Sequence, residues 1–286
     1  MEKDKSKPEF LYAGDIWSAL WGNDYTKPLA YTISHAVAKS DMTFTTNEYS
    51  FWEYKPFRSM FMFNSIMKHE ENANLFLSIY PFCKGVENEL SFCDVLESSE
   101  DNTEGYVLLQ KNNAVPMWMF NPLYLKQQKQ LLQHLDEHNE RQKFMIFGIG
   151  WDIIKTPPRS IKIYEGKNDY KVALQEFLRA NPDKSEDDFP LIKTADASHM
   201  NFIGVMQCDD AYEFSSDIYS ISEFKYHGTM FYCLEIAVLR YSGEHAEDEK
   251  GLRLKLYANK ELLGAYKPQI GDNISGIMQL NAYLCD

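Results

Sequence analysis

The stretch from Pro268 to Gly276 reads Pro-Gln-Ile-Gly-Asp-Asn-Ile-Ser-Gly and opens the last apolar segment of the chain. Its Gly271-Asp272 pair is typical of a tight turn. After this turn, every second residue from Ile274 to Leu284 is apolar or Gly, and the residues between them include Ser275 and Gln279. A period of two predicts a strand with one buried face, so substitutions of Gln279 on the other face are expected to cost little stability.

Four more strand-like segments precede this one in the C-terminal third. They are residues 200–207, 214–226, 229–240 and 252–258. His227-Gly228 separates the second from the third, and Gly can take the positive φ that a two-residue hairpin needs. Five antiparallel strands with a short connector before the last resemble a small barrel of the oligonucleotide/oligosaccharide-binding (OB) kind. The resemblance lies in strand count and in the ending, and no sequence fingerprint carries it.

The N-terminal half is also rich in strand signals. Aromatic and β-branched residues dominate 42–67, and further candidate strands are 74–82, 89–96, 105–109 and 114–120. Residue spacing and capping residues predict helices at 15–21, 122–143 and 169–180, and the apolar run 144–154 fits a strand buried on both faces. The predicted fold class is therefore α+β, predominantly antiparallel β, with a few helices and a C-terminal five-stranded OB-like or barrel-like domain.

An acidic, turn-rich stretch at 183–188 marks the predicted domain boundary. We expect an N-terminal mixed β-rich domain at 1–182, an acidic linker at 183–199 and a C-terminal barrel-like β domain at 200–286. Each half also ends on a long apolar strand, 144–154 and 229–240, followed by alternating basic and apolar residues. Divergent duplication would produce this echo, and so would coincidence.

Composition argues against several classes of protein. The 286 residues are 44% hydrophobic and 25% charged, as in ordinary folded proteins, and no window approaches 18 apolar residues, so no membrane span is expected. The five cysteines form no CxxC pair, which favours free thiols in a reducing cytosol. The charged N-terminus lacks a signal-peptide pattern, so we expect a cytoplasmic protein. A net charge of −13 disfavours direct nucleic-acid binding and favours a protein partner with a basic surface.

One motif could carry metal chemistry. His134-Leu135-Asp136-Glu137-His138 matches H-x-x-E-H, the pattern of inverzincin metallopeptidases, and lies on the best predicted helix. His134 and His138 would bind zinc, Glu137 would act as general base, and Glu213 or Glu223 would supply a third ligand. Against this, the motif lies on a polar helix face, and none of the surrounding inverzincin pattern accompanies it. The expected cofactor is none, with zinc as the alternative.

Other candidate sites have simpler explanations. His69-Glu70-Glu71-Asn72 fits a charged turn better than a metal cluster, and 244–249 fits a solvated acidic loop. Asp209-Asp210 with Glu213 could pair carboxylates for acid–base chemistry, but the same residues make a polar turn. The chain contains no G-x-S-x-G, no P-loop pattern and no G-x-G-x-x-G. The sequence therefore offers no convincing catalytic set.

The predicted function is that of a non-enzymatic, cytosolic binding protein that engages another macromolecule through its acidic surface. An immunity or inhibitor protein of a microbial conflict system is one concrete form of this prediction. Two alternatives stay open. The first is a zinc-dependent hydrolase that uses His134, Glu137 and His138, and the second is an oligonucleotide- or sugar-binding barrel. Apart from the zinc alternative, no catalytic, metal-binding or cofactor-binding residues are predicted.

Overall fold

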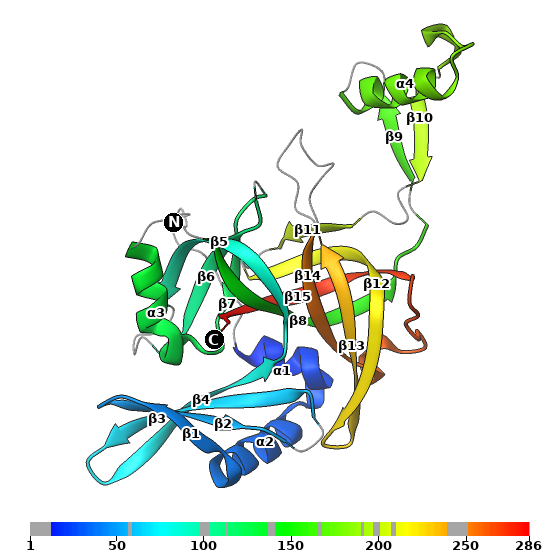
Figure 1. Cartoon of the computed structure of the whole chain (residues 1–286). Coiled ribbons are helices and arrows are strands. Elements are labelled where there is room, and N and C mark those ends of the chain that lie inside the picture. Colours follow the sequence, from blue (N-terminus) through cyan, green and yellow to red (C-terminus); the bar gives the residue numbers. More distant parts are fainter. Residues whose placement is uncertain are drawn as a thin grey trace, which may run out of the picture. The chain divides into compact units, whose positions relative to one another are not determined.

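The computed structural model in Figure 1 describes residues 13–56, 59–97, 103–112, 114–136, 141–158, 160–164, 168–189, 192–196, 201–206, 210–238 and 251–285. Contacts divide the chain into two compact units. The main unit combines Met1–Lys155 with Asn201–Asp286, and the inserted unit is Thr156–Met200. The described residues form mainly antiparallel sheets and four α-helices, which agrees with the predicted α+β class.

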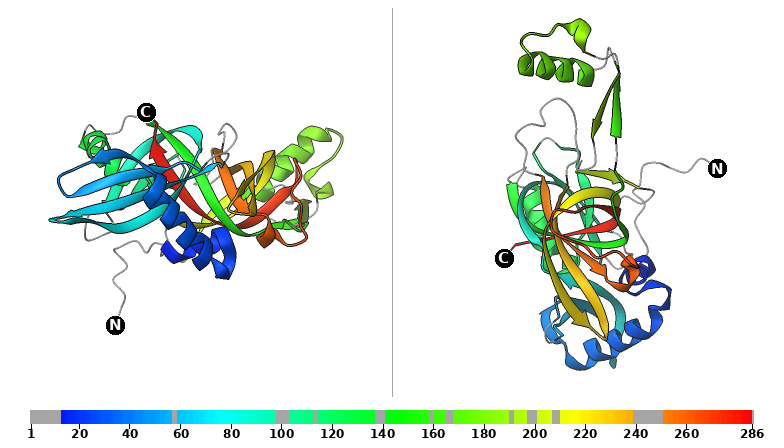
Figure 2. Two further views of the ribbon diagram at one scale, coloured as in Figure 1. Left: turned by 90° about the horizontal axis from the view of Figure 1, so that it is seen from below. Right: turned by 90° about the vertical axis from the view of Figure 1, so that its right-hand side faces the viewer.

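The main unit begins with two helices and a four-stranded antiparallel sheet. The helices are α1 (Ala13–Trp21) and α2 (Thr26–Lys39), and the strands in sheet order are β1 (Asp41–Thr45), β2 (Tyr49–Tyr54), β3 (Phe61–Glu70) and β4 (Ala73–Cys83). α2 packs against β2 and β3, and Figure 2 shows both helices beside the sheet. The sequence patterns predict α1 but not α2, because the apolar residues of α2 are mostly small or β-branched.

Five strands of the larger sheet close into a ring. They are β12 (Ala211–Tyr226), β13 (Thr229–Val238), β14 (Leu252–Asn259), β8 (Arg141–Lys155) and β15 (Asn273–Leu284). The pairs β12–β13 and β13–β14 are antiparallel, and β14 then pairs with β8 in parallel. β8 pairs antiparallel with β15, and β15 pairs antiparallel with β12, which closes the ring. We call this arrangement the C-terminal ring.

A second ring, the N-terminal ring, uses the same β8–β15 pair. Its other strands are β5 (Val86–Glu97), β6 (Gly105–Gln110) and β7 (Met117–Phe120), which form an antiparallel meander. β7 pairs in parallel with β15, and β8 pairs antiparallel with β5. Each ring thus contains a three-stranded meander, the long strand that follows it and the long strand of the other half (Figure 1). The helix α3 (Tyr124–Asp136) joins β7 to β8, as the helical turn Glu261–Leu263 joins β14 to β15.

The repeated topology matches β8 with β15. By contrast, the sequence echo matches 144–154 with 229–240, and the second of these segments contains β13. The two rings therefore repeat the same strand order and direction. The two apolar runs that suggest a duplication in the sequence do not occupy equivalent positions in the two rings.

The C-terminal ring differs from the predicted barrel in one strand. Within 200–207, β11 (Phe202–Val205) pairs with Tyr212–Ser215 of β12, and the same β12 residues pair with β15 on their other edge. β11 therefore lies outside the ring, and β8 takes the fifth place. The contact-based division also differs from the predicted boundaries 1–182, 183–199 and 200–286, because β8 pairs with strands of the last third. The alternation of apolar and polar residues predicts which side chains of a strand are buried, but it does not predict which strand lies beside it.

Both faces of β15 are buried. Ile274, Met278 and Leu280 lie in the apolar core, as the alternation predicts. On the other face, however, Gln279 is only 1% exposed, and its Nε2 donates a hydrogen bond of 2.7 Å to Oδ2 of Asp210. The expectation that substitutions of Gln279 cost little therefore rests on a wrong premise.

Three apolar clusters stabilise the main unit. The first fills the rings, the second joins α1, the four-stranded sheet and the β12–β13 hairpin, and the third joins the other face of that sheet to β6 and β7. Examples are Phe144, Leu256 and Met278 in the first, Trp17, Phe61 and Phe231 in the second, and Phe51, Tyr106 and Phe120 in the third. The sheet is thus covered on both faces at the end where β4 leads into β5.

The inserted unit has a small core of its own. β9 (Ser160–Tyr164) pairs antiparallel with β10 (Ile192–Asp196), and α4 (Asn168–Ala180) lies between them in sequence. Tyr170 packs edge-on against Phe189 with ring centroids 5.1 Å apart. The helix confirms the one predicted at 169–180. The acidic stretch 183–188 lies between α4 and β10, within the inserted unit of the contact-based division.

Candidate functional site

An open hollow of about 290 Å³ lies on the four-stranded sheet near the C-terminal end of α2. We call it the apolar hollow, because four of the five side chains that line it are apolar. They are Val37 of α2, Trp52 of β2, Met67 of β3, and Asn74 and Phe76 of β4.

Strand register places these side chains on one face of the sheet. Met67 lies opposite Phe76 in the β3–β4 ladder and opposite Ser50 in the β2–β3 ladder. Opposite residues of an antiparallel ladder project to the same side, and Trp52 follows Ser50 by two residues. Met42 of β1 lies opposite Trp52, so it extends the same apolar face.

The helix α2 covers only part of this face. Thr32 and Ala36 are buried, and Oγ1 of Thr32 is 2.8 Å from the hydroxyl oxygen of Tyr226, which fixes the helix against the β12–β13 hairpin. Val37 follows Ala36 and is 54% exposed, and Met42 is 52% exposed. Grouped exposed apolar side chains mark interaction surfaces, whereas isolated ones are ordinary.

Trp52 can present its ring to a ligand without an unsatisfied donor. Its indole N–H donates a hydrogen bond of 2.9 Å to Oγ of Ser50 in the same strand. Met67 beside it has a flexible side chain that can adapt to different shapes. Trp is also among the residue types that contribute most to binding when an interface covers them.

The turn between β3 and β4 forms an acidic tip next to the apolar hollow. An open cavity of about 590 Å³ there is lined by residues 69–73, which include the exposed Glu70 and Glu71. The neighbouring β1–β2 turn adds the exposed Glu48, whose carbonyl oxygen accepts a hydrogen bond of 2.7 Å from the backbone N–H of His69. We use "acidic tip" for Glu48, Glu70 and Glu71.

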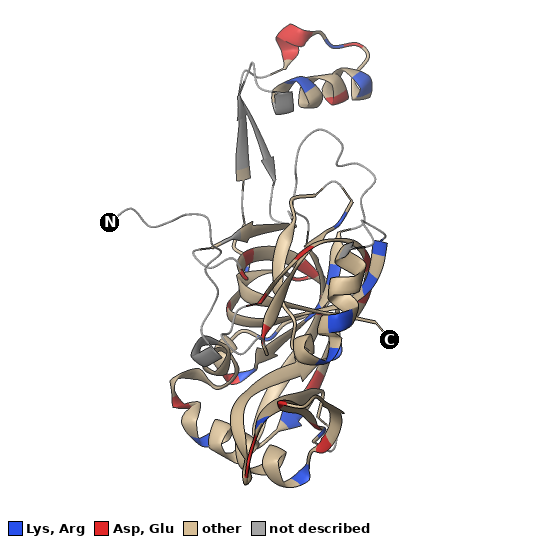
Figure 3. Ribbon diagram, turned by 90° about the vertical axis from the view of Figure 1, so that its left-hand side faces the viewer, with Lys and Arg blue, Asp and Glu red and all other residues tan. Residues whose placement is uncertain are grey.

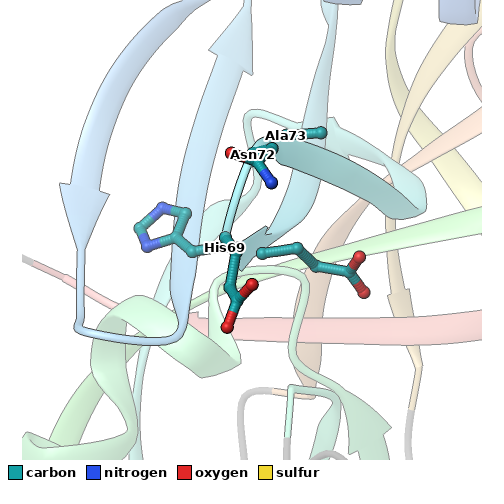
Figure 4. A pocket seen from close by; sticks show the side chains of 5 residues that line it. His69, Asn72 and Ala73 are labelled. Carbon is teal, nitrogen blue, oxygen red and sulfur yellow. The ribbon is translucent and has the colours of Figure 1, made fainter.

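The acidic tip does not have the form of a metal centre. Nδ1 of His69 is 3.2 Å from the carbonyl oxygen of Asn47. Figure 4 shows the His69 ring and the Asn72 side chain pointing in different directions. Within the described part of the chain, no group of three or more His, Cys, Asp or Glu side chains could hold a metal. The tip is an exposed acidic turn at the end of the β3–β4 hairpin.

Glu53 of β2 has a structural role. Burial raises the pKa of its carboxyl, but hydrogen bonds and charges from Lys55 and Lys126 and the Thr43 hydroxyl outweigh burial, and the pKa lies below its ordinary value. The nearest contacts are 2.8 Å to Nζ of Lys55 and 3.3 Å to Nζ of Lys126. Because Lys126 belongs to α3, this ion pair connects the sheet to the helix that joins β7 to β8.

The structure describes only part of the predicted zinc motif. His134 lies half-buried in the last turn of α3, whereas Glu137 and His138 lie outside the described residues. Of the proposed third ligands, Glu213 is exposed on β12, and Glu223 pairs with Nζ of Lys260 at 3.1 Å. The described residues thus do not bring a ligand set together around His134.

The paired carboxylates predicted near the start of β12 are also separated. Asp210 is fully buried and binds Gln279, whereas Glu213 is exposed, and Asp209 lies outside the described residues, as does the loop 244–249. The structure therefore does not place Asp210 and Glu213 in one solvent-accessible site.

Sequence reasoning missed the apolar hollow. Trp52, Met67 and Phe76 lie in aromatic strand patterns, which are typical of core residues. Only the position of α2 shows that they are partly uncovered, and the sequence patterns do not predict that helix. The run Glu70-Glu71 beside such strands was the available signal.

Comparisons with known proteins do not assign the chain to a family. No family model matches it, and no curated protein or solved structure is significantly similar to it. None of the helices that the structure describes is both long and apolar enough to span a membrane. The interpretation of function therefore rests on the geometry of the apolar hollow and the acidic tip.

Proposed function

We propose that this protein is a non-enzymatic binding protein whose apolar hollow and acidic tip hold a basic, partly apolar segment of a partner protein. The observation that supports this function is the adjacency of the two surfaces on one β-hairpin: Asn74, which lines the hollow, lies opposite His69, which lines the cavity at the tip. A ligand a few residues long can contact both.

Each surface selects a different property of the ligand. The hollow buries apolar side chains, which supplies affinity at roughly 25 cal/mol for each Å² of apolar area removed from water. The carboxylates of Glu48, Glu70 and Glu71 attract Lys or Arg and disfavour acidic segments, which supplies selectivity and faster association. The pair of surfaces therefore favours alternating apolar and basic residues.

The overall charge supports a basic partner. The inserted unit contains eight acidic and seven basic residues, so the main unit carries nearly all of the net charge of −13. Figure 3 shows basic and acidic segments mixed along α4 of the inserted unit. A negative main unit steers positively charged ligands toward it, and salt weakens this attraction. An immunity or inhibitor protein that covers a basic partner in the cytosol is the form of this function that we favour.

A peptide-binding measurement tests the proposal. The probe is the amidated, fluorescein-labelled peptide KLKVKLK, with ELEVELE as its charge-reversed control, and the readout is fluorescence anisotropy. We expect KLKVKLK alone to bind, and Val37→Glu to weaken binding by at least about tenfold, or about 1.4 kcal/mol. Leu75→Glu is the matched control, because Leu75 lies on the same hairpin, is 49% exposed and faces the other side of the sheet. Equal binding to the two variants would contradict the proposal.

We infer further that the C-terminal ring is an OB-like barrel completed by a strand from the N-terminal half. The support is its strand order: an antiparallel meander β12–β13–β14, a parallel neighbour β8 and an antiparallel closing strand β15. An OB-like ring alone assigns no ligand, since one fold serves many functions. The acidic charge argues against nucleic acid as the ligand.

A further inference from the structure

The outer edge of β4 borders the apolar hollow. In the sheet order β1-β2-β3-β4, β4 is the last strand, and its first residues, Ala73 to Ile79, include no charged residue and no Pro. Ala73, Asn74 and Leu75 are exposed. Natural proteins usually protect a sheet edge with charges, Pro, bulges or a covering element, because an open edge pairs readily with another strand.

Backbone geometry shows which groups of β4 face outward. Glu70 and Ala73 flank the two-residue turn Glu71-Asn72 and lie opposite each other. Residues that flank such a turn exchange hydrogen bonds, so the N–H and C=O groups of the alternate residues Asn74 and Phe76 point away from β3. Within the described residues, no backbone hydrogen bond reaches Asn74 or Phe76 from another segment. A register shift beyond Phe76 limits the regular edge to Ala73–Phe76.

The opposite edge of the sheet is better protected. β1 is only five residues long, carries Asp41 and has a register shift between Met42 and Phe44. A bulge and a charge both hinder the addition of a strand. The β4 edge is therefore the better template, and the residues whose backbone groups face outward, Asn74 and Phe76, are also the β4 residues that line the apolar hollow.

We propose that the basic, partly apolar segment binds as an added antiparallel strand on β4. This inference rests on the proposed function, because it assigns a binding mode to the same ligand. Backbone hydrogen bonds to Asn74 and Phe76 hold the segment, and its alternate apolar side chains project on the same face as those two residues, into the hollow. Its basic side chains near the β3–β4 turn reach Glu70 and Glu71. A second copy of this chain is the competing occupant, and mutual repulsion of two chains of charge −13 disfavours it.

Backbone N-methylation of the probe peptide tests the mode of binding. In antiparallel pairing, the amides of KLKVKLK that face β4 belong to the Leu and Val residues, whose side chains enter the hollow. N-methylation at Leu and Val should therefore weaken binding by at least about tenfold, and N-methylation at the inner Lys residues should leave it nearly unchanged. If both methylated peptides bind like the parent while Val37→Glu still abolishes binding, strand addition is wrong and the proposed function stands. If the parent peptide does not bind, the proposed function itself fails.

A variant of the protein gives an independent measurement. Asn74→Pro removes the outward N–H without removing a hydrogen bond to β3, and Asn74→Ala keeps that N–H while it removes the side-chain amide. Both variants lose the same side chain from the hollow, so we expect Asn74→Pro to bind the probe peptide at least about tenfold more weakly than Asn74→Ala, with circular dichroism confirming that both fold. Sedimentation equilibrium of the full chain identifies the occupant. A dimer that Asn74→Pro abolishes would show that the edge binds a second copy and would overturn the peptide as its ligand.

Discussion

Gln279→Glu is a sharp test of the packing around β15, because a change of nearly equal shape reverses one buried contact. Gln279 is 1% exposed, Asp210 is fully buried, and the hydrogen bond between Nε2 and Oδ2 is 2.7 Å long. The substitution replaces the donor by a second carboxylate against Asp210. Leaving a buried charge uncompensated costs about 3–5 kcal/mol. We expect a loss of about 4 kcal/mol in the free energy of unfolding at pH 7, or about 8–16 °C in Tm for a unit of this size.

Gln279→Met is the control, because it removes the same hydrogen bond without adding charge. A hydrogen bond to a charged group contributes about 1.5–3 kcal/mol, so the Met variant should lose less than the Glu variant. Burial and Asp210 both raise the pKa of the introduced carboxyl in the folded state. The extra cost is therefore present above the pKa of the unfolded chain, about 4.3, and disappears below it. Urea unfolding of both variants between pH 7 and pH 4 measures this convergence. A Gln279→Glu protein as stable as the wild type, or a difference between the variants that does not change with pH, would refute the buried contact.

Three further predictions concern the inserted unit, a close approach of backbones and the zinc alternative. Replacing Thr156–Met200 by about eight Gly and Ser residues should leave the main unit folded with Tm changed by only a few degrees. The linker length follows from the strand pairing. Lys155 on β8 lies opposite Ile274 on β15, Ile274 lies opposite Ser216 on β12, and β11 is the next strand beyond β12. Lys155 and Asn201 are therefore about three strand spacings, or roughly 14 Å, apart, and a flexible linker of this length spans about 15 Å. Gly85→Ala should cost about 3 kcal/mol in urea unfolding, because its Cβ would lie 2.6 Å from the backbone of Ile146, whereas Gly204→Ala, with nothing within 4 Å, should cost less than about 1 kcal/mol. Elemental analysis of the purified protein should find no stoichiometric zinc, and zinc that His134→Ala removes would favour the hydrolase.

Local patterns predicted most strands and helices, because burial on one face leaves a periodic signal. The predicted strand 229–240 corresponds to β13, 274–284 to β15 and the helix 169–180 to α4. The helix 122–143 is shorter than predicted, since α3 ends at Asp136 and β8 begins at Arg141. These elements depend on neighbouring residues, which is the information that a period of two or 3.6 contains.

Long-range partners were not predictable in the same way. Nothing near 144–154 indicates that β8 pairs with β5, β14 and β15, because hydrogen bonding between strands is independent of side-chain identity. For a similar reason, the apolar hollow was not predicted. Trp52 and Phe76 look like core residues in the sequence, and only the position of α2 shows that they are partly uncovered. The missed helix α2 therefore explains why the sequence did not predict the apolar hollow. Its Pro28 lies in the first turn, where a helix tolerates Pro, but Pro in a sequence is more often a sign of a break.

Strand edges are paired in the centre of the rings but open at one side of the four-stranded sheet, and this difference supports the position of the proposed site. β8 has β15 on one edge and β5 followed by β14 on the other, so both of its edges are paired along the centre of the rings. Along residues 144–149, where both edges of β8 are paired, the rings offer a ligand side chains and not backbone groups of β8. The four-stranded sheet remains open at β4, where an uncharged edge, an apolar hollow and exposed carboxylates lie within one hairpin. Recognition through the backbone is therefore available at the β4 edge and not at residues 144–149 of β8. The Asn74→Pro variant separates the two regions, because it changes the β4 edge and leaves the rings intact.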